Sequence, residues 1–326
     1  MSFAVSVAIL AAVVSVTAAL PGVVLVLRRQ AMLADALSHA VLPGIAIAAL
    51  WSVSPDSPLL LVGATAGGVL VIALTEWLRN NGKVTEDSAT GLIFPAFFAV
   101  GVILVSTAFN TSSVSEHTVL VGDLNIAAMQ HWVVGYLDLG PRSAWTIGAV
   151  GLITGTVLVV ARRPLMISTF DPVFAHSIGI RAKMLNYVIM VLVALTVVVV
   201  FNAAGAVLAV ALMVVPAAAA LLVTNSQTAM FIATIVIALL SSQVGFWVAF
   251  QLDAATSPTM ALADGLIFLA LWVGYLIKRR IAQRRAGLEV ATPGRVPAQD
   301  ADSVLEPGTI AAVGAPQVSV SQASAT

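Results

Sequence analysis

Two residues that can bind a metal ion, Asp35 and His39, lie four positions apart in strongly apolar sequence. If this stretch is helical, the two side chains are separated by about 40° around the helix axis and about 6 Å along it, so both can reach one point. Aspartate oxygen and histidine nitrogen are ligands for divalent transition metals. Ionisable groups inside a membrane are costly and usually line a pathway. The pair is therefore a candidate metal site; the alternative is an Asp–His hydrogen bond that only holds two helices together.

Pro43 and Gly44 follow His39 in the same stretch. Small residues let membrane helices pack closely, and proline permits kinks beside a cavity. We expect this dipeptide to break the helix that carries the pair and to leave free carbonyl groups near it.

The composition places this stretch in a multi-pass membrane protein. Of 326 residues, 60% are hydrophobic and only 9% are charged, against about 25% charged in soluble domains. The formal net charge is zero, so no global basic field favours nucleic acid as a partner. The absence of cysteine excludes disulfides, thiolate metal sites and thiol nucleophiles. Phosphate-loop, H-E-x-x-H and G-x-S-x-G motifs are also absent.

Apolar runs of about 20 residues predict an all-α bundle of about nine transmembrane helices, with eight or ten as alternatives. Because the first basic residue is Arg28, the first run is interpreted as an uncleaved helix rather than a signal peptide. The less apolar region 110–143 could hold a short interfacial or re-entrant helix. The predicted spans lie near 3–27, 31–51, 58–78, 89–109, 144–161, 184–203, 205–223, 229–249 and 258–277.

Basic residues cluster in alternate loops, which predicts an external N-terminus and a cytoplasmic C-terminus in the cell membrane. Residues 1–280 are predicted to form the transmembrane domain. Residues 281–326, rich in Ala, Pro, Ser, Gly and Gln toward their end, are predicted to form a disordered cytoplasmic tail. The basic clusters are Arg28-Arg29, Arg79 with Lys83, Arg162-Arg163, Arg181 with Lys183, and Lys278-Arg279-Arg280.

A second informative stretch lies in a predicted cytoplasmic loop. Asp171 and Pro172 are typical of a helix start, and Gly179 is placed to end the helix, with Phe174 and Ile178 on one side. A short capped helix of this kind can dock on a partner, or it can be a surface connector.

Several other residues could carry charge or bind an ion. Asp264 enters the last apolar run and is expected to face the bundle interior, while Asp253 precedes that run. His117, beside Glu116 and near Asp123, weakly suggests an external ion-gathering site, although solvated loop residues would look the same. Two further histidines are His131, in the external region, and His176, in the cytoplasmic loop.

Four stretches, in the correct order, resemble the permease subunit of the ATP-binding-cassette manganese/zinc/iron importers. The resemblance extends from about residue 5 to residue 277. The matching stretches are Asp35–Gly44 (family G-D-A-L-S-H-A-V-L-P-G), Thr85–Phe94 (K-E-D-T-A-x-G-I-x-F), Phe170–Ile180 (F-D-P-E-x-A-x-x-x-G-I) and Gly205–Ala219 (G-x-L-L…P-A-A-x-A).

This resemblance implies a type II importer permease without permanently bound cofactor and without enzymatic activity of its own. Two copies would form the pathway, separate ATPase subunits would dock on the cytoplasmic loops, and an extracytoplasmic metal-binding protein would deliver the ion. Asp35 and His39 would coordinate the transported manganese, zinc or ferrous ion, with manganese slightly favoured. The residues implied in ATPase coupling are Asp171, Pro172, Phe174, Ala175, Gly179 and Ile180.

Two other functions stay open on the residues. A gradient-driven secondary transporter would need a charged relay, for which only Asp35, His39, Glu76 and Asp264 are candidates within the spans. An intramembrane metalloenzyme would have only two ligands per chain, whereas catalytic zinc keeps three protein ligands. A second copy could supply more ligands. An adjacent ATPase gene and solute-binding-protein gene would favour the importer.

Overall fold

A computed structural model describes residues 2–51, 58–82, 84–108, 123–134 and 137–290. In these ranges nine helices are long and apolar enough to cross a membrane, which confirms the predicted all-α bundle. They are α1 (Phe3–Leu27), α2 (Ala31–Ala49), α3 (Pro58–Gly82), α4 (Glu86–Ala108), α7 (Arg142–Val160), α10 (Ala182–Ala204), α11 (Ala206–Val223), α12 (Gln227–Leu252) and α13 (Thr256–Val290).

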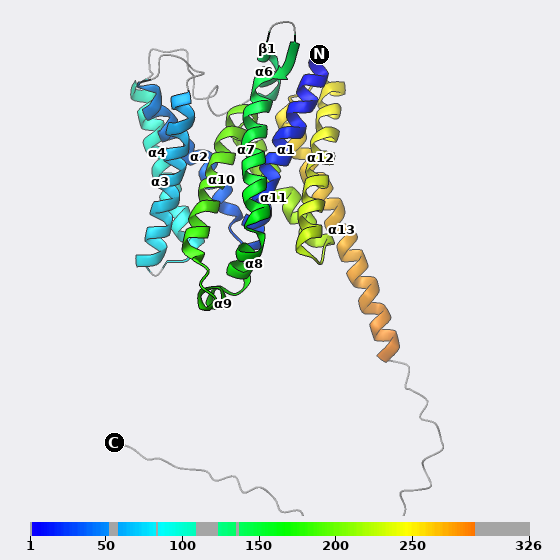
Figure 1. The fold of residues 1–326 in the computed structure, drawn as a ribbon. Coiled ribbons are helices and arrows are strands. Elements are labelled where there is room, and N and C mark those ends of the chain that lie inside the picture. Colours follow the sequence, from blue (N-terminus) through cyan, green and yellow to red (C-terminus); the bar gives the residue numbers. More distant parts are fainter. Residues whose placement is uncertain (1, 52–57, 83, 109–122, 135–136, 291–326) are drawn as a thin grey trace, which may run out of the picture. The chain divides into compact units, whose positions relative to one another are not determined.

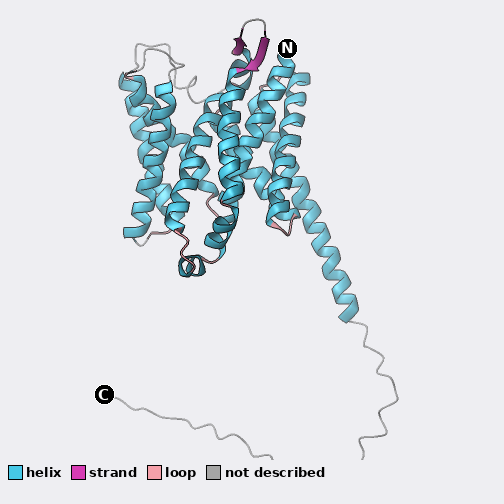
Figure 2. Ribbon diagram, viewed as in Figure 1, coloured by secondary structure: helices cyan, strands magenta, loops and turns pink. Residues whose placement is uncertain are grey.

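The short elements lie in the two longer connections. The region after α4 contains α6 (Leu124–Met129), whose first turn is capped by Asp123, and an antiparallel hairpin of β1 (His131–Val134) and β2 (Leu137–Pro141). Figure 2 shows this hairpin at the end of the bundle where the chain begins. The short helix was expected and the hairpin was not, although β-branched and aromatic residues in 131–134 favour a strand. At the other end, α8 (Arg162–Phe170) and α9 (Pro172–Ser177) connect α7 to α10.

Helix α1 lies among α7, α10, α11 and α12 (Figure 1). Its polar side chains bond across these contacts: Ser242 donates to the Ser15 hydroxyl at 3.1 Å, and Thr17 donates to the Ile147 carbonyl at 3.4 Å. Such bonds satisfy polar groups that would otherwise be buried in apolar surroundings. Gly22 brings the backbones of α1 and α11 together, because a Cβ there would lie 1.7 Å from the Met213 carbonyl oxygen.

Helices α2, α3 and α4 pack on one another and form a group on one side of the bundle in Figure 1, with α10 contacting α2 and α3. Phe201 and Val198 of α10 join Val41 of α2 and Ala64 of α3 in one buried apolar cluster. This group carries the candidate metal ligands.

The chain divides into a compact unit ending at Ile277 and a second unit that begins at Lys278. Helix α13 continues through this point to Val290, so residues 281–290 are helical and differ from the expected disordered tail. Residues such as Ile281, Ala282 and Leu288 favour helix, which explains the extension. The rest of the predicted tail, 291–326, lies outside the described residues.

Candidate metal site

Asp35 and His39 lie one turn apart on α2, with His39 Nε2 at 3.7 Å from Asp35 Oδ1. Both side chains are partly accessible: 55% of the Asp35 side chain and 31% of the His39 side chain are exposed. The opposite face of this segment is buried, since Ala34 and Leu37 are inaccessible to solvent. The helix therefore turns its apolar residues into the bundle and leaves the carboxylate and imidazole together, in the geometry expected from the sequence.

Two aromatic rings of α4 hold the His39 imidazole. Its ring lies 5.5 Å from that of Phe98 in an edge-on arrangement and 5.9 Å from that of Phe94 in a tilted one. Edge-on and offset contacts of this kind are favourable beyond simple burial. This clamp joins residues of two helices, α2 and α4, and was not predicted because no pattern along the chain shows which helices are neighbours.

The Nδ1 atom of His39 is buried and has no hydrogen-bond partner within the described chain. Buried polar atoms are normally paired, so an unpaired ring nitrogen indicates a site that is completed by something else. The imidazole thus has one nitrogen facing the Asp35 carboxylate and one buried nitrogen without a hydrogen-bond partner in the described chain.

The pair is an open site. Across the described ranges, no three His, Cys, Asp or Glu side chains are close enough together to hold one metal ion. One carboxylate and one imidazole leave most coordination positions of a divalent ion free for water or for a second molecule. Such a site can hold an ion briefly but does not enclose it.

The expected helix break at Pro43-Gly44 is wrong, because α2 runs unbroken from Ala31 to Ala49. The dipeptide instead forms a tight three-helix contact. A Cβ on Gly44 would lie 2.2 Å from the Gly63 carbonyl oxygen of α3, and one on Gly101 of α4 would lie 2.9 Å from Pro43. Proline is tolerated inside this helix because neighbouring membrane helices support it. It still has no N–H to donate to the His39 carbonyl one turn earlier.

The second predicted segment has the expected caps. The Asp171 carboxylate accepts a bond from the Phe174 backbone N–H at 2.8 Å, and Pro172 occupies the first turn of α9. Gly179 ends the segment with a positive φ of 79°. Ile180 N–H donates back to the Ala175 carbonyl at 2.9 Å, so the carbonyls at the helix end are satisfied.

This segment presents apolar side chains to its surroundings. Val173 is 79% exposed, and Phe174 and Ile178 are about half exposed, while Ala175 is fully buried. Arg28, in the turn between α1 and α2, donates to Thr169 of α8 at 3.2 Å and also bonds Asn186 of α10. The chain just before the metal pair is therefore tied to both elements that flank α9.

The remaining candidates that the structure describes form no metal-binding cluster with the pair. Asp264 is buried in α13 at 1% exposure, as expected, and neither carboxylate oxygen has a partner that meets hydrogen-bond geometry, although the Ser241 hydroxyl lies nearby. Asp253 caps α12 in a left-handed conformation. Glu76 bonds Arg79 on the same helix. His131 lies in β1 and His176 in α9. His117 lies outside the described residues.

These features define a class: a multi-pass membrane permease with an open ligand pair on one helix and a short capped helix between two spans. The model of the ABC 3 transport family matches residues 1–274. The chain is 37% identical to the zinc transport system membrane protein TroD of Treponema pallidum, over 82% of this chain and 72% of that protein. It is 36% identical to the manganese transport system membrane protein MntD of Bacillus subtilis, over 80% and 88% of the two chains.

A solved structure, PsaBC from Streptococcus pneumoniae in complex with Fab, has the same fold at a TM-score of 0.69 and 26% identity, covering 83% of this chain and 91% of that one. The chain belongs to the ABC 3 transport family. It is thus a transport permease of the membrane and not itself an enzyme, and it works with separate ATP-binding-cassette ATPase subunits and a substrate-binding protein.

Proposed function

We propose that this chain is the permease subunit of an ATP-driven importer for a divalent transition metal ion, and that Asp35 and His39 bind the ion during transport. The observation that carries the proposal is the partly accessible carboxylate and imidazole, whose Oδ1 and Nε2 atoms lie 3.7 Å apart, on a helix within the membrane bundle. The zinc and manganese transport relatives support the choice of cargo.

The donor set suits such a cargo. One oxygen and one nitrogen ligand, with no sulfur, favour manganese, ferrous iron or zinc over monovalent copper. Taking a bare carboxylate out of water is expensive, so a passing cation compensates it. In a homodimer the two pairs would face each other across the pathway and offer up to four ligands at one moment of the cycle.

The partners follow from the two ends of the bundle. ATPase subunits would dock on the exposed apolar side chains of α9, and an extracytoplasmic metal-binding protein would deliver the ion at the opposite end. This arrangement requires an external N-terminus and a cytoplasmic α9, in agreement with the distribution of Lys and Arg.

A gradient-driven transporter is less well supported. Glu76 already has a partner in Arg79, and the buried Asp264 of α13 does not join Asp35 and His39 in one cluster of three within the described ranges.

Uptake of radioactive Mn²⁺ and Zn²⁺ tests the proposal. Asp35→Asn keeps the size of the side chain but removes its charge, and His39→Ala removes the nitrogen. Each should lower uptake by about tenfold or more at unchanged membrane levels, since each removes half of the chain's protein ligands. Asp253→Asn is the matched control, because asparagine tolerates the left-handed cap at this exposed site. Wild-type rates for both ions in both variants would reduce the pair to a structural contact.

A further inference from the structure

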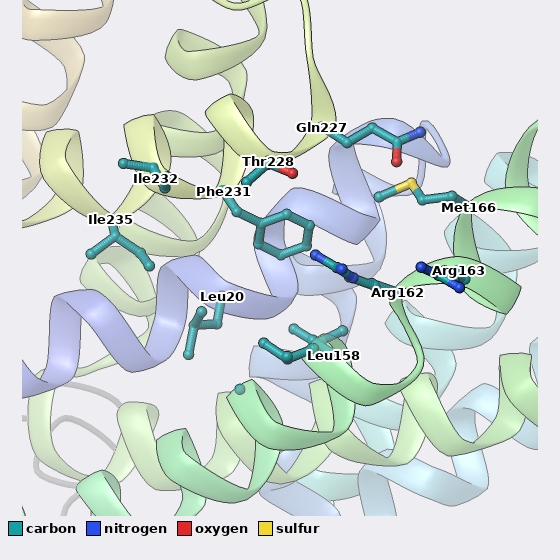
Figure 3. A pocket seen from close by; sticks show the side chains of 12 residues that line it. Leu20, Leu158, Arg162, Arg163, Met166, Gln227, Thr228, Phe231, Ile232 and Ile235 are labelled. Atoms are coloured by element: carbon teal, nitrogen blue, oxygen red, sulfur yellow. The ribbon is translucent and has the colours of Figure 1, made fainter.

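A cavity of about 510 Å³ lies where α7 ends, between α1, α7, α8 and α12. Its walls are apolar and include Leu20, Leu158, Phe231 and Ile235 (Figure 3). Leu158 is buried and Phe231 is half-buried, so the apolar walls of the cavity lie among packed helices and not in an exposed loop. The size falls in the range of about 300–1,000 Å³ that is typical of sites for small organic ligands.

The rim of the same cavity is polar and positively charged. Arg162 and Arg163 begin α8, and Gln227 and Thr228 begin α12; all four side chains are exposed. In Figure 3 the Arg162 side chain points toward Phe231, at the border between rim and wall. The cavity is therefore amphipathic, with its charge at one end.

Nothing described in the chain neutralises this rim. No carboxylate lines the cavity, neither arginine forms an ion pair within the described ranges, and the first turns of α8 and α12 contain no acidic residue. The N-terminal end of α12 adds partial positive charge, whereas at α8 this effect is offset by the carboxyl end of α7 two residues earlier. The rim thus has charge complementarity to an anion.

The position of the cavity identifies the source of that anion. Helix α7 crosses the apolar layer and ends at Val160, and Arg162 follows two residues later. Leu165 and Met166 of α8 are buried, which holds this helix against the bundle at the membrane boundary. Basic pockets between transmembrane helices at this depth bind anionic lipid head groups.

We propose that this cavity binds an anionic phospholipid, with its phosphate at Arg162 and Arg163 and an acyl chain along Leu20, Phe231 and Ile235. The apolar walls distinguish this ligand from free phosphate, which would use only the rim. The site is separate from the Asp35–His39 pair and does not depend on the cargo.

Native mass spectrometry of the full chain, released from nanodiscs of phosphatidylglycerol or of phosphatidylcholine, tests this. Wild-type protein should retain phosphatidylglycerol in preference to phosphatidylcholine. Each arginine near an anionic surface contributes about a fivefold gain in binding, so R162Q/R163Q should lower retention by about 10- to 30-fold. R162K/R163K should keep most of it, and R181Q/K183Q, which removes two exposed charges outside the cavity, should leave it unchanged.

A second arm separates the lipid from a free anion. Ile235→Trp fills the apolar wall and should lower phosphatidylglycerol retention while the arginines are intact. Inorganic phosphate at millimolar concentration should not displace the lipid. Equal retention of both lipids, unchanged retention in R162Q/R163Q, or displacement by phosphate would overturn the proposal. If R162Q/R163Q changed the oligomeric mass of the protein but not its lipid retention, the cavity would be part of a protein–protein contact. That result would also overturn the proposal.

Discussion

His39 contacts a charged group on one side and apolar rings on the other. On its own helix it faces the Asp35 carboxylate, and across the helix contact it lies against Phe94 and Phe98. The carboxylate can share a cation with the imidazole, whereas the rings can only restrict how the imidazole turns. If the pair binds the ion as proposed, the first contact would affect affinity for the ion and the second would affect the orientation of the imidazole.

Phe98→Leu should therefore weaken transport without abolishing it. Leucine keeps most of the apolar volume but loses the edge-on ring contact, so the imidazole gains freedom and the KM for Mn²⁺ uptake should rise about three- to tenfold with little change in maximal rate. Phe97→Leu is the control, since this neighbour on α4 makes no ring contact with His39. Equal KM values in the two variants would show that the ring does not orient the ligand.

At the scale of elements, α9 is a six-residue helix that exists because both of its ends are fixed. Asp171 caps the start and Gly179 allows the left-handed turn at the end. A helix this short has little stability of its own, so the hydrogen bonds of its two caps are needed to stabilise it. Its exposed apolar residues are consequently presented in a defined orientation.

Gly179→Arg should abolish metal uptake and weaken ATPase pull-down, while the permease still inserts at normal levels. A Cβ at this position meets no atom within 4 Å, so the substitution acts through backbone strain and through bulk on the outer surface. Gly179→Asn separates the two effects, because asparagine accepts the same backbone conformation with a small side chain, and it should retain most activity. Normal pull-down and uptake in Gly179→Arg would remove the segment from the docking surface.

The contact of α2 with α3 is a second feature at this scale. Gly44→Ala should lower stability by about 1–3 kcal/mol, because the new methyl group would overlap backbone atoms of Gly63 that cannot move aside cheaply. Gly91→Ala on α4 is the matched control: nothing lies within 4 Å of its Cβ, and alanine favours helix. Thermal unfolding in detergent measures both. Equal unfolding temperatures for Gly44→Ala and Gly91→Ala would show that the close contact of Gly44 with Gly63 does not contribute to stability.

At the scale of the whole molecule, the orientation in the membrane decides which partner meets which end. Helix α12 offers a direct measurement, because Asn225 precedes it and Asp253 follows it, and both side chains are exposed. The chain contains no cysteine, so single cysteines can be introduced without background. In intact cells an impermeant maleimide should label Asp253→Cys, and it should label Asn225→Cys only after permeabilisation. The reverse pattern would invert the orientation and move α9 to the outside.

Much of this architecture could be predicted along the chain, and most of what was missed depends on contacts between helices. Apolar run length identified the nine spans, and local capping chemistry identified α9. The Asp35–His39 geometry followed from helical periodicity alone. The clamp on His39, the close contact made by Gly44 and the amphipathic cavity beside α8 could not be predicted, because helices that are apolar all round do not reveal which face meets which neighbour.

The close contact between α2, α3 and α4 also limits how these helices can move. It is formed by Pro43 and Gly44 with Gly63 and Gly101. Backbone in contact with backbone leaves no room for α2 to slide or rotate against α3 and α4, since any neighbouring side chain brought to this point would overlap the opposite helix. The three helices are therefore expected to move together rather than past one another. If Asp35 and His39 bind the ion as proposed, the two ligands would keep their spacing during such a movement, so the ion would be carried with them.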